Sequence, residues 1–468
     1  RVDRYYPPAQ DIIENEYPEM TLIMGVCHSE DRDIPSALVI LDEHQELKDH
    51  MLLGHSRRVE TYRQGIEDFI KKHMPHVIAV GTSDLGAMDL FEDLRDIVDA
   101  LAKENFAPEG LVQMRVIFVK DEIPGIYSAS PRAAQEFPML SRLARQGVGL
   151  ARYLADPLQE ITNIACSIDE LLCVNMHHQQ KAIDPYVLIK HLHRELIDTT
   201  NAVGVDVNSL VNHRFRLGPL QFIGGLGPRK SEALRHKILT SGGLLRKREE
   251  LITKEMLGAC VFQNCAGFLL VNHLMERDMD VRSLGETRIH PENYQLAVKM
   301  AKNALDDERE GDEQDDEMSI EDVMRAENKH KLDQLDLEAY AEALAAEGQE
   351  RKYTLYQIKD ELQEPAKAPE WVSYKELKKE EIFMALTGET QKTLQPGRLV
   401  MCTVFKIAPR GLVVKHESGL SGYIQIERFS DQYEQGMKPE DFPLQDKIAI
   451  KASISARVVE VNIDGLFP

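Results

Sequence analysis

The segment Ile223–Lys230 combines turn glycines with cationic side chains in a way that suits phosphate binding. Gly225 and Gly227 can bring a bare backbone turn close to a ligand and leave its N–H groups free to donate. Arg229 and Lys230 follow directly and would add cationic contacts. This spacing predicts a turn and a following helix that together hold a phosphate group.

The residues on either side of this turn fit the helix-hairpin-helix pattern. Leu226 would be the apolar residue beneath the turn, and Pro228 would open the second helix. That helix keeps helical spacing in its apolar residues Ala233, Leu234 and Ile238. Such contacts go to the phosphate backbone and carry little sequence information. A turn that merely packs two helices is the alternative, because the same pattern occurs in proteins that bind no DNA.

The charge of the surrounding segment supports nucleic-acid binding. Residues 213–255 contain ten Lys or Arg against four Glu, a local charge of +6, whereas the whole chain has 56 basic and 78 acidic residues and a net charge of −22. Such local basicity in an acidic chain needs a local reason, and a polyanionic partner would supply one. The residues expected to contact nucleic acid are Gly225, Gly227, Arg229, Lys230, Arg214, Arg216, Arg246, Lys247 and Arg248.

Length and cysteine usage set the broad class. With 468 residues, 43% of them hydrophobic, the chain has room for about three to five domains. Its six cysteines show no CxxC pair or zinc spacing, and there is no signal peptide or long apolar segment. We therefore expect a reduced, intracellular, monomeric protein without metal, cofactor or membrane contact. The chain begins without methionine and stops inside a strand-like pattern, so we expect it to be part of a longer protein.

Residues 21–156 predict an α/β domain. The expected strands are Thr21–Ser29, Ala37–Glu43, Glu46–Leu53, Val77–Gly81 and Val112–Lys120, and the expected helices are Val59–His73, Leu85–Asn105 and one that Ser130 caps and Pro131 opens. Three strands followed by helix, strand, helix, strand and helix is the order of the ribonuclease-H-like fold.

The first strand of this domain argues against nuclease chemistry. Enzymes of this fold that resemble RuvC or YqgF hold two magnesium ions with carboxylates, the first on this strand, because in-line phosphodiester hydrolysis needs metals at the attacking and leaving oxygens. Nuclease-like relatives show Gly-x-Asp-Pro-Gly where this chain has residues 25–29, so Cys27 takes the place of the Asp. A thiol is a poor magnesium ligand. A nuclease would need substitute acids, for which the candidates are Asp31, Asp33, Asp84 and Glu92.

Several motifs resemble the core of bacterial Tex and of its eukaryotic homologues. In chain order they are Pro124–Pro131, Glu136-Phe137-Pro138, Asp156-Pro157-Leu158 and Asp206-Val207-Asn208. The Glu30–Asp33 loop and a later acidic insertion are more similar to the eukaryotic suppressor-of-Ty-six family of transcription elongation factors and histone chaperones. The resemblance covers about Thr21 to Pro468. It implies a nuclear protein that travels with the RNA polymerase II elongation complex and whose nuclease-like domain is inactive.

The central part of the chain is expected to be helical. Residues 1–20 form a leading segment and 157–212 a scaffold with a Ser167–Glu170 capping box and a helix from Asp184-Pro185 to Gly204. The helix-hairpin-helix domain covers 213–276. A second hairpin near Gly258 keeps only one turn glycine, so we expect it to serve packing.

Residues 277–365 are expected to form the small helical domain that the family calls death-like. Residues 306–317 include nine acidic residues in twelve, which predicts a mobile surface loop. The functional alternative is that this acidic run binds basic histone surfaces. Ser319 and Asp322 would form a capping box for the helix after it.

The last part of the chain predicts a small β-barrel. Residues 366–393 would be a linker with a short helix at Tyr374–Ala385, and 394–468 a truncated five-stranded OB-fold module of the ribosomal-protein type, with strands at Val400–Ile407, Gly411–His416 and Gly422–Ile426. Such modules bind single strands by stacking bases on aromatic rings. The candidate contacts are Phe405, Lys406, Arg410 and Tyr423. Gln425 replaces the usual His and the Phe-Gly-x-Phe pattern is missing, which weakens the prediction of RNA binding by this module and leaves a protein contact as the alternative.

Together with these patterns, the resemblance implies a multidomain, non-enzymatic transcription elongation scaffold and histone chaperone. It would bind DNA without sequence preference, with RNA as a second candidate ligand, together with core histones and the RNA polymerase II elongation complex. Two alternatives stay open. One is a magnesium-dependent structure-selective nuclease, and the other is a protein-interaction core whose basic segment faces an acidic segment of another protein.

Overall fold

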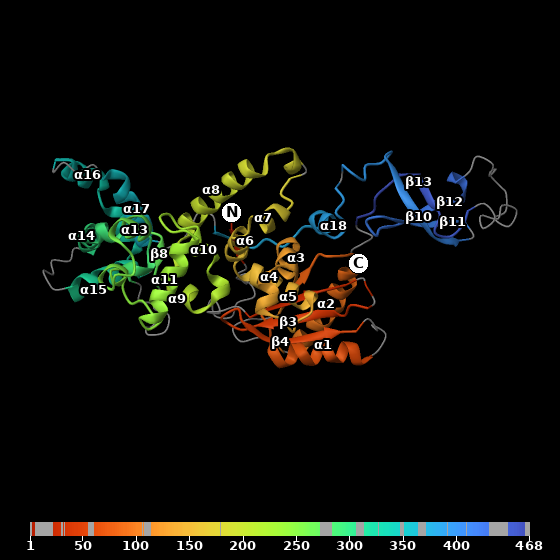
Figure 1. The fold of residues 1–468 in the computed structure, drawn as a ribbon, viewed down its shortest axis with the longest axis horizontal. Helices are drawn as coiled ribbons and strands as arrows, with labels where there is room; N and C mark the ends of the chain where they lie inside the picture. Colours follow the sequence, from red (N-terminus) through yellow and green to blue (C-terminus); the bar gives the residue numbers. More distant parts are fainter. Residues whose placement is uncertain are drawn as a thin grey trace. The chain divides into compact units, whose positions relative to one another are not determined.

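The computed structural model describes residues 2–4, 22–54 except 30 and 32, 60–271 except 105, 107–113 and 178, and 283–463 except 306–312, 326, 347–350, 364–370, 391, 409 and 430–447. The chain divides into two compact units. One comprises Arg1–Tyr5 and Asp156–Tyr374, and the other comprises Tyr6–Ala155 and Lys375–Pro468. Figure 1 draws both units and labels many of their helices and strands.

A five-stranded mixed sheet forms the centre of the second unit. Its spatial order is β4 (Leu47–Leu53), β3 (Ser36–Leu41), β2 (Ile23–Cys27), β5 (Val77–Gly81) and β6 (Arg115–Val119). β3 runs antiparallel to β2 and β4, while β5 runs parallel to β2 and β6. β2, β3 and β5 are buried at every position, which explains their continuous apolar sequences. With α1 (Glu60–His73) and α2 (Gly86–Lys103), the predicted ribonuclease-H-like order is confirmed.

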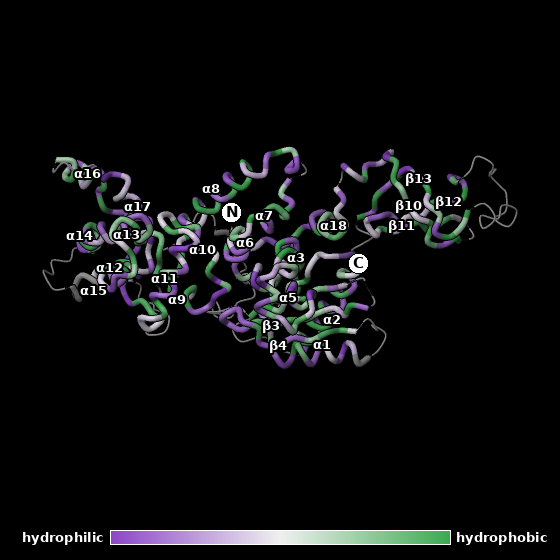
Figure 2. The backbone as a smooth tube through the Cα atoms, viewed as in Figure 1, coloured by the Kyte–Doolittle hydropathy of each residue, from purple (hydrophilic) through white to green (hydrophobic). Residues whose placement is uncertain are grey.

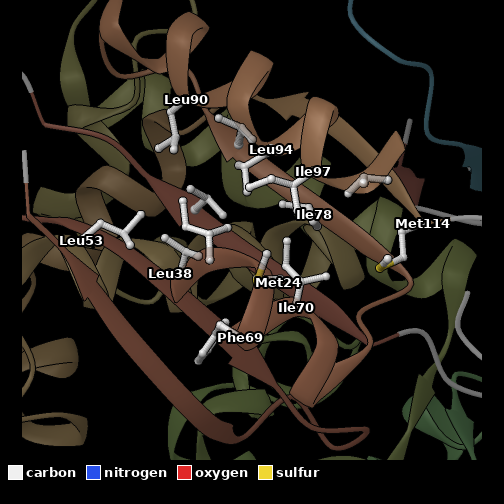
Figure 3. Close-up of a cluster of buried hydrophobic side chains, with 14 of the residues drawn as sticks. Met24, Leu38, Leu53, Phe69, Ile70, Ile78, Leu90, Leu94, Ile97 and Met114 are labelled. Carbon is white, nitrogen blue, oxygen red and sulfur yellow. The ribbon is translucent and has the colours of Figure 1, made fainter. Parts of the chain in front are cut away.

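Apolar side chains of α1 and α2 pack on one face of this sheet. Figure 3 shows part of this core, with side chains from both layers pointing toward one another: Met24, Leu38, Leu53, Phe69, Ile70, Ile78, Leu90, Leu94, Ile97 and Met114. Each of them is at most 7% exposed. Burial of one such side chain stabilises the fold by about 1.5–3 kcal/mol. In Figure 2, α1 alternates between hydrophilic and hydrophobic segments, as expected for a helix with one face on a sheet.

Helix α5 (Arg142–Ala155) packs against the opposite face of the sheet. Met24 and Val26 face α1 and α2, so the intervening Gly25 faces the other way. A Cβ atom at Gly25 would collide with the carbonyl oxygen of Gly147 on α5. The helix therefore approaches the central strand at a point where neither backbone carries a side chain.

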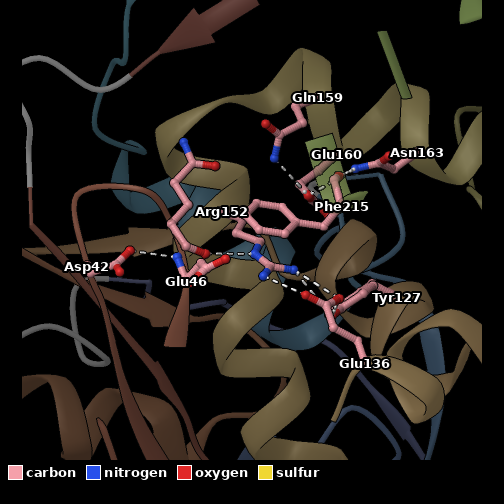
Figure 4. A network of polar contacts seen from close by, with 10 residues as sticks. Asp42, Glu46, Tyr127, Glu136, Arg152, Gln159, Glu160, Asn163 and Phe215 are labelled. Carbon is pink, nitrogen blue, oxygen red and sulfur yellow. Dashed lines mark hydrogen bonds and ion pairs between the residues drawn. The ribbon is translucent and has the colours of Figure 1, made fainter. Parts of the chain in front are cut away.

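Two short helices connect β6 to α5. Ser130 accepts a hydrogen bond from the N–H of Ala133 at 3.1 Å and caps α4 (Pro131–Glu136), as predicted. α3 (Glu122–Ala129), which precedes it, was not predicted. Arg152 of α5 is only 1% exposed and donates to Glu136 at 2.7 and 3.2 Å, and Tyr127 of α3 donates to the same carboxylate at 2.8 Å (Figure 4). This buried charge is paired, so it holds the three helices together.

The small barrel contains four strands within the described residues. Their antiparallel order is β12 (Ser421–Gln425), β11 (Gly411–His416), β10 (Leu399–Ala408) and β13 (Ser453–Arg457). The first three match the predicted strands, and β13 was not assigned from the sequence. α18 (Lys379–Thr387) begins five residues later than the predicted helix, and its Leu386 belongs to the core of the large sheet.

The first unit is mostly helical. Its first helices are α6 (Pro157–Ala165), α7 (Ile168–Cys173), α8 (Pro185–Val203), α9 (Val207–Asn212), α10 (Gly218–Gln221), α11 (Pro228–Thr240), α12 (Glu250–Thr253) and α13 (Ala259–Cys265). A further cluster consists of α14 (Tyr294–Leu305), α15 (Glu313–Met324), α16 (Leu337–Ala346) and α17 (Lys352–Gln363). Two parallel strand pairs complete it: β7 (Val205–Asp206) with β8 (Leu269–Leu270), and β1 (Val2–Arg4) with β9 (Trp371–Ser373). No helix in these described ranges is long and apolar enough to cross a membrane.

Helix ends in this unit test the predicted caps. Asp184 accepts from the N–H groups of Tyr186 and Val187, and Gly204 ends α8 with φ +79°, so both ends of this helix are confirmed. The Ser167 side chain accepts no capping hydrogen bond, so the capping box predicted there is wrong.

The region around the acidic run also differs from its prediction. Ser319 lies inside α15 rather than at its start, because the helix already begins at Glu313. Residues 313–317 of the predicted acidic loop are therefore helical, and residues 306–312 lie outside the described part of the chain. The strands β1 and β9 fall in segments that were expected to be a leading segment and a linker.

Candidate nucleic-acid interface

The first hairpin joins α10 to α11. The N–H of Leu226 donates to the carbonyl oxygen of Ile223 at 3.0 Å and closes the turn. Ile223 is buried in the core of this domain, and Leu226 packs against the same core. The predicted role of Leu226 as the apolar residue beneath the turn is confirmed.

The two turn glycines have different surroundings. Gly225 has φ +85°, and a Cβ atom there would lie 2.9 Å from the Cβ of Asn264 on α13. Glycine is therefore required at this position by both the backbone and the packing. Gly227 has an extended φ of 167°, which any residue can adopt, and a Cβ atom there would meet nothing within 4 Å. The backbone at Gly227 is thus open to an approaching ligand.

The N-terminus of α11 offers unpaired donors. Pro228 at the first helical position has no N–H, and the N–H of Ser231 donates to the carbonyl oxygen of Gly227 at 2.9 Å. In the part of the chain that the structure describes, the backbone N–H groups of Gly227, Arg229 and Lys230 have no acceptor. These donors, together with the dipole of a 13-residue helix, favour an anion at this end.

Basic side chains surround this helix end to different degrees. Arg229 is exposed, and the exposed Lys230 donates from Nζ to the carbonyl oxygen of Gly225 at 2.9 Å, across the turn. Exposed positions are also held by Arg214, Arg246 and Lys247. Arg216 is half-buried, with its guanidinium carbon 5.7 Å from the centre of the Phe215 ring. These residues keep their predicted role as contacts, which no observation here tests.

Arg248 does not belong to this surface. Its side chain is 1% exposed and donates to the carbonyl oxygens of Ile289 at 2.7 Å, Gly285 at 2.8 Å and Thr287. Burial lowers the pKa of this guanidinium. The prediction of a nucleic-acid contact is wrong for this residue, because its donors satisfy a backbone loop that follows the hairpin domain.

The second hairpin, between α12 and α13, is built into the core. Met256 and Phe262 are buried among the apolar residues of the domain. Lys237 of α11 donates to the carbonyl oxygens of Glu255 and Met256 at 2.9 and 3.1 Å, so it fastens the two hairpins together. Burial raises the pKa of the neighbouring Cys265 to about 12. This arrangement agrees with the predicted packing role.

The exits of β2, β5 and β6 form the place where a nuclease of this fold would bind metal. Cys27 is fully buried, and burial, with smaller effects of Asp121 and Asp84, raises the pKa of its thiol well above the usual value. His28 and Asp84 pair at 2.7 Å. Asp121 was missed in the sequence although it lies only two residues after the end of β6. Burial raises its pKa, and Gln146 donates to it at 3.0 Å.

Of the substitute acids considered for a nuclease, Asp84 lies at these exits. Asp31 accepts from the N–H of Asp33 in a local turn, and Asp84 accepts from the N–H of Ala87 while it pairs with His28. Among the described residues, no group of three or more His, Cys, Asp and Glu side chains is placed to hold a metal ion.

The candidate single-strand contacts lie on the small barrel. The side chains of Phe405 and Tyr423 are 68% and 54% exposed, and Lys406 and Arg410 are exposed as well. Phe405 occupies a break in the β10–β11 register between Val404 and Lys406. Their role in binding single strands stays a prediction.

Four families match successive segments of the chain. Residues 17–165 match the family described as Holliday-junction resolvase-like of SPT6, 169–272 a helix-hairpin-helix motif, 282–369 an HHH domain, and 381–467 the Spt6 S1/OB domain. The described α/β, helical and barrel domains agree with these matches. Over 282–369 the match is to a helix-hairpin-helix domain, and the death-like assignment stays a prediction.

The chain is also similar to curated transcription elongation factors. It is 33% identical over 398 residues to spt6 of Schizosaccharomyces pombe, covering 84% of this chain and 28% of that protein. It is 29% identical over 454 residues to spt-6 of Neurospora crassa, with 92% and 31% covered, and 27% identical over 513 residues to SPT6 of Drosophila melanogaster, with 94% and 27% covered. The chain thus spans less than a third of the length of these relatives.

Proposed function

The chain belongs to the Spt6 family of transcription elongation factors, and we propose that it is a non-enzymatic core of such a factor that binds duplex DNA through its first hairpin. Binding would be independent of sequence, because backbone amides and cationic side chains contact phosphates rather than base edges. The observation that carries this proposal is the N-terminus of α11, where unpaired amides, an open backbone at Gly227 and the exposed Arg229 come together.

The wider role follows from the family. We propose that the protein acts in the nucleus with the RNA polymerase II elongation complex and core histones, and that several weak surfaces on one scaffold replace a single strong contact. RNA is a further candidate ligand of the same non-specific kind. Sedimentation of the chain with histones H3–H4 tests the chaperone part, and absence of a complex at physiological salt would contradict it.

Replacement of Arg229 tests the hairpin. Arg229→Ala removes one phosphate contact, so the slope of log K against log salt should fall by about 0.9, and affinity at about 0.1 M salt should fall roughly eightfold for every duplex sequence. The matched control is Lys254→Ala. Lys254 belongs to the same basic segment, but it pairs with Glu250 at 2.7 Å on α12, and its loss changes net charge equally. Fluorescence anisotropy with two unrelated duplexes at several salt concentrations measures both quantities.

The control separates a specific contact from general attraction. If both variants weaken binding alike, DNA responds to net charge alone and the hairpin assignment fails. If Arg229→Ala changes neither affinity nor slope, the basic segment faces a protein, and the interaction-core alternative takes its place.

A further inference from the structure

The outer face of the small barrel carries a row of exposed apolar side chains. Leu399 and Met401 of β10 are 65% and 51% exposed, and they alternate with the inward-facing Val400 and Cys402. Phe405, further along the same strand, is 68% exposed and lies at the register break between Val404 and Lys406. Water contact along such a row is unfavourable, so the row indicates an interaction surface.

Polar neighbours on both adjoining strands frame this row. In the sheet register, Leu399 lies opposite Arg457 and Met401 opposite Ser455, both on β13. Thr403 lies between Ser453 on β13 and Lys415 on β11. Because residues directly opposite in a sheet share a face, the apolar row is bordered by hydroxyl groups and cations.

The row ends in a hollow of about 270 Å³. Its walls include Thr403, Phe405, Lys415, Ile450 and Lys451. Ile450 is 59% exposed, so aromatic and aliphatic surface lie beside two lysines. Among the described residues that line this hollow, Glu417 is the only acidic one.

We propose that this face binds an acidic peptide segment of a partner protein. Apolar side chains of the peptide would pack on Leu399 and Met401, and one further apolar side chain of the peptide would enter the hollow. Lys415 and Lys451 would pair with carboxylates of that segment. Bases stack on aromatic rings, whereas most of this row is aliphatic, which favours a protein over a single strand. A second copy of the chain is a poorer match, because symmetric pairing would bring the same cations together.

The test selects peptides on the full chain from a phage library of random peptides. Clones that also bind the double variant Met401→Ser/Phe405→Ser are then removed. Both replaced side chains are exposed, so this variant keeps the core of the barrel. Enriched peptides are then measured by fluorescence anisotropy on the wild type, on this variant, on Lys415→Glu/Lys451→Glu and on Tyr353→Ser. Tyr353 of α17, 87% exposed, controls for the loss of an exposed aromatic residue in the other unit. Oligouridine RNA and sedimentation of the chain alone form the remaining arms.

We expect the enriched peptides to be rich in Asp, Glu and large apolar residues. Both double variants should weaken them roughly tenfold or more, while Tyr353→Ser leaves them unchanged. Basic peptides, or peptides indifferent to the double variants, would overturn it. Oligouridine binding that depends on Phe405 and Lys415 would assign the face to RNA instead, and a dimer lost in Met401→Ser/Phe405→Ser would assign it to self-association.

Discussion

Replacement by alanine should have different effects at Gly225 and at Gly227 of the first hairpin. Gly225→Ala should destabilise the fold by about 1–3 kcal/mol, because it combines a left-handed backbone with a clash against Asn264. Gly227→Ala should leave the free energy of unfolding almost unchanged and yet weaken duplex binding, since the new methyl group would occupy the space through which a phosphate approaches. Urea unfolding and DNA anisotropy on both variants measure this. Equal binding by Gly227→Ala and the wild type would contradict the close backbone approach.

Arg248 is predicted to stabilise the fold rather than bind DNA. Arg248→Met should lower the free energy of unfolding by on the order of 3 kcal/mol, because three buried carbonyl oxygens lose a charged donor. Urea unfolding measures this difference in stability. At urea concentrations well below the unfolding transition, Arg248→Met should bind DNA more tightly than Arg246→Met, because only Arg246→Met loses a phosphate contact. A variant with normal stability and no DNA binding would restore Arg248 to the interface.

At the level of elements, the close contact between β2 and α5 reverses a usual effect of glycine replacement. Gly→Ala in a strand or helix normally stabilises by about 0.5–1 kcal/mol. Gly25→Ala should instead lower the free energy of unfolding by about 2 kcal/mol or more. The new Cβ atom would clash with the backbone of α5, and only a shift of the whole helix could relieve this clash. Gly65→Ala on α1 is the control. A Cβ atom at this position meets nothing within 4 Å, so this variant should have a higher free energy of unfolding than the wild type. Thermal unfolding compares the two, and a stabilised Gly25→Ala would disprove the contact.

Elements with a strong local signal could be predicted, and those that depend on distant partners could not. Val77–Gly81 is a continuous apolar run and was predicted to the residue. β13 alternates small and apolar residues, and its assignment needed β10 as a partner. The same reason explains why Arg248 was wrongly predicted to contact nucleic acid. A basic sequence is the same whether its guanidinium binds a phosphate or carbonyl oxygens that lie about forty residues further along the chain.

At the scale of the whole molecule, charge restricts where DNA can approach. A net charge of −22 repels a polyanion, whereas residues 213–255 around the first hairpin carry a local charge of +6. Screening confines each charge to about 10 Å at 0.1 M salt, so the basic segment can act although the rest of the chain is acidic. We therefore predict that duplex DNA contacts the segment around the first hairpin and avoids the acidic surface of the chain.

Hydrogen–deuterium exchange of the whole chain, with and without a duplex, tests this claim most directly. The unpaired amides at Gly227, Arg229 and Lys230 should exchange more slowly when DNA is bound, while peptides from β2, β5 and β10 keep their rates. Unchanged exchange over residues 223–231, or protection centred on the barrel or the large sheet, would contradict the assignment of the first hairpin as the DNA-binding surface.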